Sequence, residues 1–216
     1  MALPYTRPMP AASGEELPSF EEIYARAGDD LASVPWARLA PHPLLVMWLN
    51  GRPAPAAQPP ALVVACGLGD DAEELARRGY SVTAFDVSAT AIAQCHRRFP
   101  ASLVRYQVAD VLGLPDAMTR RFSLVVEINT LQSLPRPDRP QAVAAIAGTV
   151  APGGLLFVRC LAGGEGEPDA AERPWPVWRS ELAGFTAAGL IQADLIDRAP
   201  VPAQHPFLRV VYERPA

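Results

Sequence analysis

Short apolar runs alternate with amphipathic stretches through the middle of the chain, between residues 61 and 160. Runs of four to six mostly apolar, β-branched-rich residues are typical of buried strands, and spacing of three or four residues between apolar positions is typical of helices. The pattern predicts strands at Ala61–Cys66, Ser81–Phe85, Leu103–Val108, Phe122–Glu127 and Leu155–Cys160, with helices at 70–79, 88–99 and Pro137–Val150.

A strand–helix alternation of this kind favours a parallel sheet with helices on both faces, because parallel strands need crossover connections. After a Gly-, Glu- and Pro-rich loop over residues 161–177, the pattern predicts a last helix at Ser180–Ala188. The runs Leu190–Ile196 and Phe207–Glu213 then suit a terminal antiparallel hairpin. We therefore expect a doubly wound, Rossmann-like α/β sheet of seven strands.

The first sixty residues have a different character, because eleven of the chain's 24 prolines lie there. Residues 1–17 read as a flexible Pro-rich lead. Apolar positions at helical spacing predict a helix at Phe20–Ala27, and Pro43 can open a second helix that runs to Leu49. We expect residues 18–60 to form a small helical cap and linker, and residues 61–216 to form the main part of a single-domain protein.

Composition narrows the class of partner. The net charge is −4, the pI is near 5.4, and all nineteen basic residues are arginines without a basic stripe, which disfavours a nucleic-acid partner. No apolar run approaches the roughly 18 residues of a membrane span. Three widely spaced cysteines without a CxxC motif indicate neither a metal site nor a disulfide framework. We expect a soluble cytoplasmic protein, a monomer or a homodimer, that acts on a small molecule.

Glycines and carboxylates stand where the predicted strands end. Gly67 and Gly69 follow the first strand, Asp86 follows the second, Asp110 the third, and Glu127 closes the fourth. In open α/β sheets, ligands bind beyond the carboxyl ends of the strands. Asp86 lies nineteen residues past Gly67, close to the spacing at which a carboxylate accepts hydrogen bonds from ribose hydroxyls. These positions predict a nucleoside-containing cofactor.

The charge next to the glycines indicates which cofactor this is. Gly67-x-Gly69-x-x-Ala72 formally satisfies the dinucleotide fingerprint, in which a pyrophosphate lies at a helix N-terminus. Asp70 and Asp71 occupy that N-terminus and would repel a pyrophosphate. They suit a ligand with an ammonium and a sulfonium, such as S-adenosylmethionine. An NAD-dependent oxidoreductase stays open as a distant alternative.

Residues 61–160 resemble class I S-adenosylmethionine-dependent methyltransferases. The resemblance is carried, in order, by ALVVACGLGDD, TAFDVS, VADVL, FSLVVEINTLQSLP and APGGLLFV. The chain departs from most of that superfamily at Val63 and Ala65, where an acidic residue and a glycine are usual. That acid usually holds the amino end of the methionine moiety, so we expect Asp70 or Asp71 to take over part of this role.

A finer resemblance is to the thiopurine and thiol/halide methyltransferases. It rests on Val-x-x-Cys-Gly-x-x-x-Asp ending at Asp71, on Thr130–Pro135 followed by Arg139, and on Pro35-Trp36. The resemblance implies S-adenosylmethionine as cofactor, S-adenosylhomocysteine as product and no metal. It implies cofactor contacts from Trp36, Cys66, Gly67, Gly69, Asp71, Asp86, Val87, Asp110, Val111 and Glu127. For the acceptor pocket we predict Tyr24, Asn129, Gln132, Trp175 and Arg209.

Methyl transfer from a sulfonium is an in-line displacement that depends on alignment and exclusion of water. No motif contains a histidine, and Glu127 is the candidate for a catalytic group acting on the acceptor. A thiol is partly ionised near neutral pH and needs no dedicated base, which favours sulfur as the acceptor atom. Nitrogen or oxygen of an aromatic metabolite is the alternative, and a non-catalytic cofactor-binding module is a more distant one.

Overall fold

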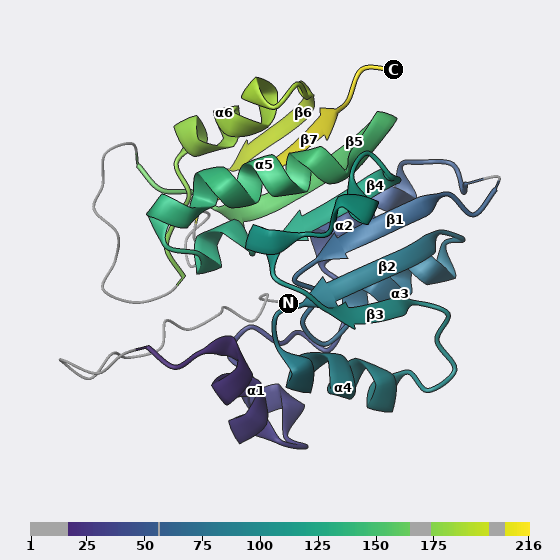
Figure 1. Cartoon of the computed structure of the whole chain (residues 1–216), viewed down its shortest axis with the longest axis vertical. Coiled ribbons are helices and arrows are strands. Elements are labelled where there is room, and N and C mark those ends of the chain that lie inside the picture. Colours follow the sequence, from purple (N-terminus) through teal and green to yellow (C-terminus); the bar gives the residue numbers. More distant parts are fainter. Residues whose placement is uncertain (1–16, 56, 165–173, 199–205) are drawn as a thin grey trace.

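The computed structural model describes residues 17–55, 57–164, 174–198 and 206–216. Its centre is a seven-stranded sheet with the strand order β3-β2-β1-β4-β5-β7-β6 (Figure 1). The strands are β1 (Pro60–Val64), β2 (Ser81–Asp86), β3 (Arg105–Val108), β4 (Phe122–Ile128), β5 (Val150–Leu161), β6 (Ile191–Arg198) and β7 (Phe207–Glu213).

Pairing within the sheet confirms the predicted architecture. Strands β1 to β5 run parallel, and Val63 of β1 lies opposite Ala84 of β2 on one side and Val126 of β4 on the other. Strand β7 is antiparallel to both of its neighbours, β5 and β6. The order of strands reverses at β1 and β4, so their carboxyl ends form the crevice in which such sheets bind ligands.

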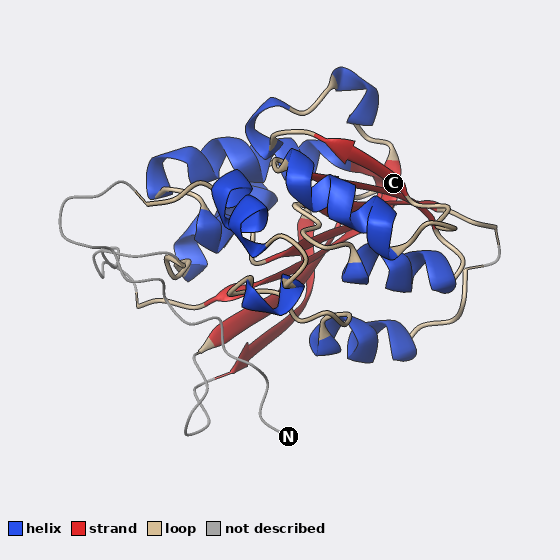
Figure 2. Cartoon of the chain, turned by 90° about the horizontal axis from the view of Figure 1, so that it is seen from below, coloured by secondary structure: helices blue, strands red, loops and turns tan. Residues whose placement is uncertain are grey.

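Helices cover both faces of the sheet, as Figure 2 shows with the strands in red between blue helices. One face packs against α2 (Pro43–Asn50), α3 (Asp70–Arg77) and α4 (Ala89–Arg98), through buried side chains such as Leu49, Leu75 and Ile92. The other face packs against α5 (Arg139–Thr149) and α6 (Arg179–Ala187), through side chains such as Ile146 and Phe185. No helix within these described ranges is long and apolar enough to cross a membrane.

The N-terminal cap consists of α1 (Phe20–Ala27), the 3-10 helix η1 (Leu31–Ser33) and α2. Helix α1 begins where predicted, because Ser19 and Glu22 form a reciprocal capping box. Ile23 and Tyr24 are its buried residues, and α1 packs against α4. The carboxylate of Glu21 accepts a 2.6 Å hydrogen bond from Ser88 Oγ, so the cap is attached to the sheet domain near the end of β2.

Several boundaries differ from the sequence prediction. Strand β3 begins at Arg105 rather than at Leu103, whose side chain is 96% exposed. Strand β5 begins at Val150, because the Pro-Gly-Gly segment stays paired through the bonds that link Gly153 and Gly154 to Arg214. Within the described ranges, four 3-10 helices lie between the predicted helices and strands, and a fifth, Arg136–Asp138, overlaps the start of the helix predicted at Pro137–Val150. Single turns of this kind carry no periodicity that a sequence pattern could reveal.

Candidate functional site

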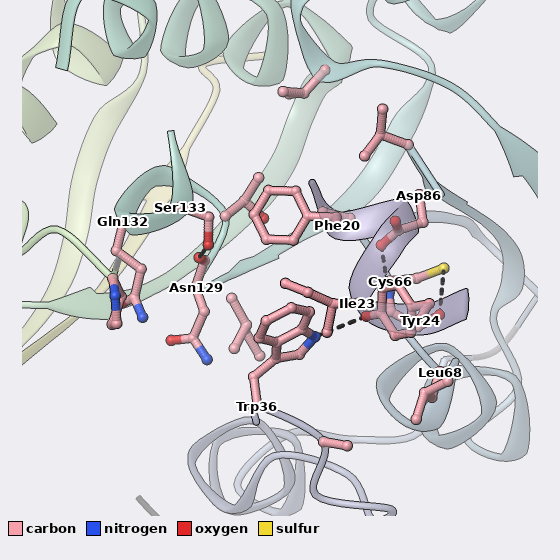
Figure 3. Close-up of a pocket in the computed structure, with 18 of the residues that line it drawn as sticks. Phe20, Ile23, Tyr24, Trp36, Cys66, Leu68, Asp86, Asn129, Gln132 and Ser133 are labelled. Carbon is pink, nitrogen blue, oxygen red and sulfur yellow. Dashed lines mark hydrogen bonds between the residues drawn. The ribbon is translucent and has the colours of Figure 1, made fainter. Parts of the chain in front are cut away.

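A cavity of about 370 Å³ lies beyond the carboxyl ends of β1, β2 and β4, between the sheet and the cap. Figure 3 shows side chains from both parts pointing into it. Many of the predicted site residues line this cavity: Tyr24, Trp36, Cys66, Gly67, Asp71, Asp86, Val87, Asp110, Val111, Asn129 and Gln132. The residues predicted from the strand ends therefore lie together at one cavity, and their contacts with a ligand stay a prediction.

Asp86 occupies the end of β2 and is bonded to the glycine loop. Its Oδ2 accepts a 2.9 Å hydrogen bond from the main-chain N–H of Gly67 (Figure 3). Its Oδ1 accepts a 3.0 Å bond from the main-chain N–H of Ser88. Burial raises the pKa of this carboxyl above its ordinary value. Each carboxylate oxygen can accept a second hydrogen bond, so Asp86 keeps acceptor capacity for hydroxyl groups in the cavity.

The two glycines of the glycine loop have different surroundings: the main chain at Gly67 is open to a ligand in the cavity, and Gly69 packs tightly against Tyr106. Gly67 has φ +53°, and a Cβ there would lie 3.0 Å from Tyr24 Oη. Gly69 has φ +89°, and a Cβ there would lie 2.6 Å from Tyr106 Oη, so only glycine fits. Gly69 is not among the residues that line the cavity. The structure shows Gly69 packing the loop against Tyr106, and its direct contact with a cofactor stays a prediction.

The far rim of the cavity follows the ends of β2 and β3. Val87 is 51% exposed and faces the cavity together with the buried Val111. Asp110 accepts a 2.9 Å hydrogen bond from Leu112 N–H through Oδ1, which fixes its carboxylate at the rim. Two apolar side chains beside a fixed carboxylate suit a flat heterocycle that carries an amino group.

The two aspartates at the start of α3 have different surroundings. Asp70 accepts hydrogen bonds of 2.9 and 2.7 Å from the guanidinium of Arg98, which compensates its charge. Asp71 accepts a 2.6 Å bond from the main-chain N–H of His42, and burial raises its pKa to about 6. Of the two acids, Asp71 is therefore the one available to a cation in the cavity.

Aromatic side chains from the cap cover the cavity. Trp36 Nε1 donates a 2.8 Å hydrogen bond to Tyr24 Oη (Figure 3). The Trp36 ring lies edge-on to the rings of Tyr24 and Phe20, with centroid distances of 5.7 and 5.5 Å. This network holds three rings together beside the glycine loop, where they can exclude water from a bound ligand.

The opposite side of the cavity contains amide groups that are already engaged. Asn129 has φ +68°, its carbonyl oxygen accepts a 2.9 Å bond from Ser133 Oγ, and its Oδ1 accepts from Arg159. Gln132 Oε1 accepts a 2.6 Å bond from Leu161 N–H, which attaches the segment after β4 to β5. The amide N–H groups of both side chains remain as donors.

His42 also lines the cavity, on the cap side. Its Nδ1 accepts a hydrogen bond from Leu44 N–H at 3.2 Å, so a neutral ring carries its proton on Nε2. Burial lowers the pKa of His42 to about 3, and the charges of Arg159 and Arg38 add to this. His42 is therefore a neutral donor at physiological pH and does not act as a base.

Three further predicted site residues, Glu127, Trp175 and Arg209, are not among the residues that line the cavity. Glu127 is fully buried, and its Oε1 accepts bonds of 2.7 and 3.1 Å from the main-chain N–H groups of Thr130 and Leu131. The main-chain N–H of Trp175 donates to the Gln132 carbonyl at 2.7 Å. Arg209 forms a 2.7 Å ion pair with Asp194 on the neighbouring strand β6.

Sequence reasoning missed Phe20, Arg38 and Ser133, and it gave His42 no role, although all of them line the cavity. Phe20, Arg38 and His42 come from the cap, whose position over the sheet is not encoded in the periodicity of either part. The distribution of charge around Pro35-Trp36 was the available signal, because Arg38 follows that motif by two residues. Among the described residues, no group of three or more His, Cys, Asp or Glu side chains is arranged to hold a metal ion.

Part of the chain is similar in sequence to known methyltransferases. Residues 61–154 match the family described as a methyltransferase domain. The ubiquinone biosynthesis O-methyltransferases of Pseudomonas putida (strain GB-1) and Pseudomonas syringae pv. tomato are each 32% identical over 118 residues, which is 54% of this chain. The matched part spans only 50% of the length of these relatives.

Solved structures show the same fold over nearly the whole chain. The N-methyltransferase NodS of Bradyrhizobium japonicum, solved with S-adenosylhomocysteine, has a TM-score of 0.70 at 20% identity and covers 91% of this chain and 98% of its own. A TehB-like S-adenosylmethionine-dependent methyltransferase of Corynebacterium glutamicum has a TM-score of 0.65 at 22% identity, with coverage of 90% and 97%. The architecture is that of Rossmann-like class I methyltransferases. The finer resemblance to thiopurine methyltransferases stays a prediction.

Proposed function

We propose that the chain transfers the methyl group of S-adenosylmethionine to a small-molecule acceptor. The observation that carries this proposal is the position of the buried Asp86 carboxylate. It accepts a hydrogen bond from Gly67 N–H at the carboxyl ends of β1 and β2, inside a cavity that the N-terminal cap covers. A carboxylate at this position suits ribose hydroxyls, and the matched methyltransferase domain includes both residues.

The remaining residues of the cavity fit the other parts of this cofactor. Asp110 at the rim would accept from the adenine amino group, with Val87 and Val111 on either side of the ring. Asp71 would face the ammonium of the methionine moiety, because its neighbour Asp70 is paired with Arg98. Bound S-adenosylmethionine supplies a methyl group on a positively charged sulfur, and S-adenosylhomocysteine remains after transfer.

The acceptor atom is proposed to be a thiol sulfur. His42 is a neutral hydrogen-bond donor, and Glu127 lies outside the cavity. Neither residue therefore serves as a base that deprotonates the acceptor. A site without a base fits an acceptor that loses its proton unaided near neutral pH, and a thiol is partly deprotonated there. The protein then contributes alignment by the cap rings and exclusion of water. The curated relatives are named O-methyltransferases, which supports oxygen as the second candidate.

The first test is calorimetric titration of the whole chain with S-adenosylhomocysteine and with NADH. We expect micromolar binding of S-adenosylhomocysteine and no binding of NADH. The reverse result would overturn the proposal and support an oxidoreductase. Binding of S-adenosylhomocysteine without methyl transfer to any acceptor tested would support a non-catalytic module.

The acceptor atom is tested with three acceptors of one shape: 4-mercaptobenzoate, 4-hydroxybenzoate and 4-aminobenzoate. Each is incubated with enzyme and S-adenosylmethionine, and the methylated product is identified by mass spectrometry. We expect the S-methyl product, formed at a rate that rises with pH until the thiol is ionised. Exclusive formation of the O-methyl or N-methyl product would contradict a thiol acceptor.

A further inference from the structure

Arg38 brings to the cavity a guanidinium that has no ion-pair partner among the described residues. It lines the cavity from the segment between η1 and α2. Its Nε is buried and has no hydrogen-bond partner among the described residues, and no described carboxylate forms an ion pair with it. A buried donor that finds no acceptor is costly, and it is retained where a ligand supplies the acceptor.

A second guanidinium, that of Arg159, lies close enough to Arg38 to feel its charge. Arg159 on β5 donates from Nη1 to Asn129 Oδ1, and Asn129 lines the cavity. The Nε of Arg159 is also buried without a hydrogen-bond partner among the described residues. Burial lowers the pKa of Arg159, and the positive charge of Arg38 adds to this effect. The two guanidiniums therefore act on the same region, and an anion there would offset both charges.

The acids around this region leave the positive charge only partly compensated. Asp71 feels the charge of Arg38, but its carboxylate accepts from His42 N–H, and burial raises its pKa to about 6. Glu127 feels the charge of Arg159, and burial raises its pKa to about 7, so it is only partly ionised at neutral pH. Neither acid forms an ion pair with either arginine within the part of the chain that is described.

We propose that Arg38 binds a carboxylate group in one part of the cavity, a carboxylate subsite, and that the positive charge of Arg159 adds to the attraction of this carboxylate. A planar guanidinium matches a carboxylate with two parallel hydrogen bonds. The carboxylate has two possible sources, namely the amino-acid end of S-adenosylmethionine or an acidic group on the acceptor. Asp71 nearby carries the charge opposite to that of Arg38, so the pair complements an α-amino acid. This inference rests on the proposed function and names the ligand group that the same cavity recognises.

The cofactor source is tested by removing the carboxylate from the ligand and the guanidinium from the protein. Wild type and Arg38→Met are titrated calorimetrically with S-adenosylhomocysteine and with its decarboxylated analogue. We expect Arg38→Met to bind S-adenosylhomocysteine about ten- to a hundredfold more weakly and to bind the decarboxylated analogue like wild type. Arg38→Lys should recover part of the loss. Arg105→Met, at an exposed position on β3, is the matched control and should bind both ligands like wild type.

The acceptor source is tested on protein saturated with S-adenosylhomocysteine, with 4-mercaptobenzoate and 4-mercaptobenzamide as probes. If wild type binds 4-mercaptobenzoate more tightly than 4-mercaptobenzamide and Arg38→Met loses this difference, the carboxylate belongs to the acceptor. Two results would overturn the subsite. In the first, Arg38→Met changes neither the preference for S-adenosylhomocysteine over its decarboxylated analogue nor the preference for the benzoate over the benzamide. In the second, it weakens binding of charged and uncharged ligands equally. Failure of wild type to bind either adenosyl ligand would overturn the proposed function instead. The two benzoate probes would then be titrated into the ligand-free protein, and that titration would decide the subsite.

Discussion

The main-chain N–H of His42 donates a 2.6 Å hydrogen bond to Oδ1 of Asp71. His42 is the residue before α2 in the cap, and Asp71 lies in the first turn of α3, directly after the glycine loop. One short bond therefore connects the cap to the loop of the proposed cofactor site. It also holds a carboxylate in a buried place where ionisation is unfavourable without a cationic partner.

Replacing Asp71 by asparagine is expected to stabilise the ligand-free protein and to weaken cofactor binding. The pKa of Asp71 is raised to about 6 from the ordinary 3.8, so its ionised form destabilises the folded state. That destabilisation is absent below about pH 4, grows between pH 4 and 6, and is complete above pH 6. Asp71→Asn should raise the free energy of unfolding by about 1–2 kcal/mol at pH 7.5 and by nothing measurable at pH 4.

Denaturant unfolding from pH 4 to 8, with calorimetry of S-adenosylhomocysteine binding at pH 7.5, checks both parts of this prediction. Binding should weaken about tenfold, because the proposed partner of the ligand ammonium loses its charge. Asp29→Asn, at an exposed position after α1, is the control. A stability gain that does not depend on pH, or unchanged affinity, would contradict the role assigned to Asp71.

Gly69→Ala is expected to unfold or severely destabilise the glycine loop. The added Cβ would lie 2.6 Å from Tyr106 Oη and 3.1 Å from Cys95 Sγ, at φ +89°. Strain and overpacking together should cost about 2–4 kcal/mol, measured as the free energy of unfolding. Gly113→Ala is the control, because a Cβ there has no neighbour within 4 Å. Equal stability of the two variants would show that Gly69 is not constrained.

The strand ends were predictable from sequence because an apolar run is followed in each case by a polar residue or a glycine. Asp86, Asp110 and Gly67 are identified in this way and line the cavity, whereas Gly69 does not. Glu127 obeys the same rule but lies outside the cavity, because its carboxylate turns back to accept from Thr130 and Leu131. Which way a side chain turns at a strand end depends on the next few residues, which form a 3-10 helix without a periodic signal.

The cap could be predicted as helices, but of its residues that line the cavity only Tyr24 and Trp36 were predicted as site residues. Ser19 and Glu22 mark the start of α1, and Pro43 marks the start of α2. What brings Trp36, Arg38 and His42 to the cavity is long-range contact, such as the bond between His42 and Asp71. Such contacts join positions that no local pattern relates, so Phe20, Arg38 and His42 were not predicted as site residues.

Asp86→Ala is expected to weaken binding of S-adenosylhomocysteine by about 1.5–3 kcal/mol, as for loss of hydrogen bonds to a charged group. It should also lower stability, because the main-chain N–H groups of Gly67 and Ser88 lose their acceptor. Asp86→Asn separates the two effects, since an amide oxygen can still accept one of these bonds. Calorimetry at a temperature where both variants are folded provides the measurement, and unchanged affinity in both would remove Asp86 from the site.

Glu127→Gln distinguishes a structural from a catalytic carboxylate. Burial raises the pKa of Glu127 to about 7 from the ordinary 4.5, so ionisation destabilises the fold as the pH rises above about 5. The neutral variant should therefore be more stable than wild type by about 1–3 kcal/mol at pH 8.5 and equally stable at pH 4. Because Glu127 does not line the cavity, turnover should stay within about threefold of wild type across the pH range. A fall in kcat of a hundredfold with unchanged affinity for S-adenosylhomocysteine would instead make Glu127 the base that acts on the acceptor.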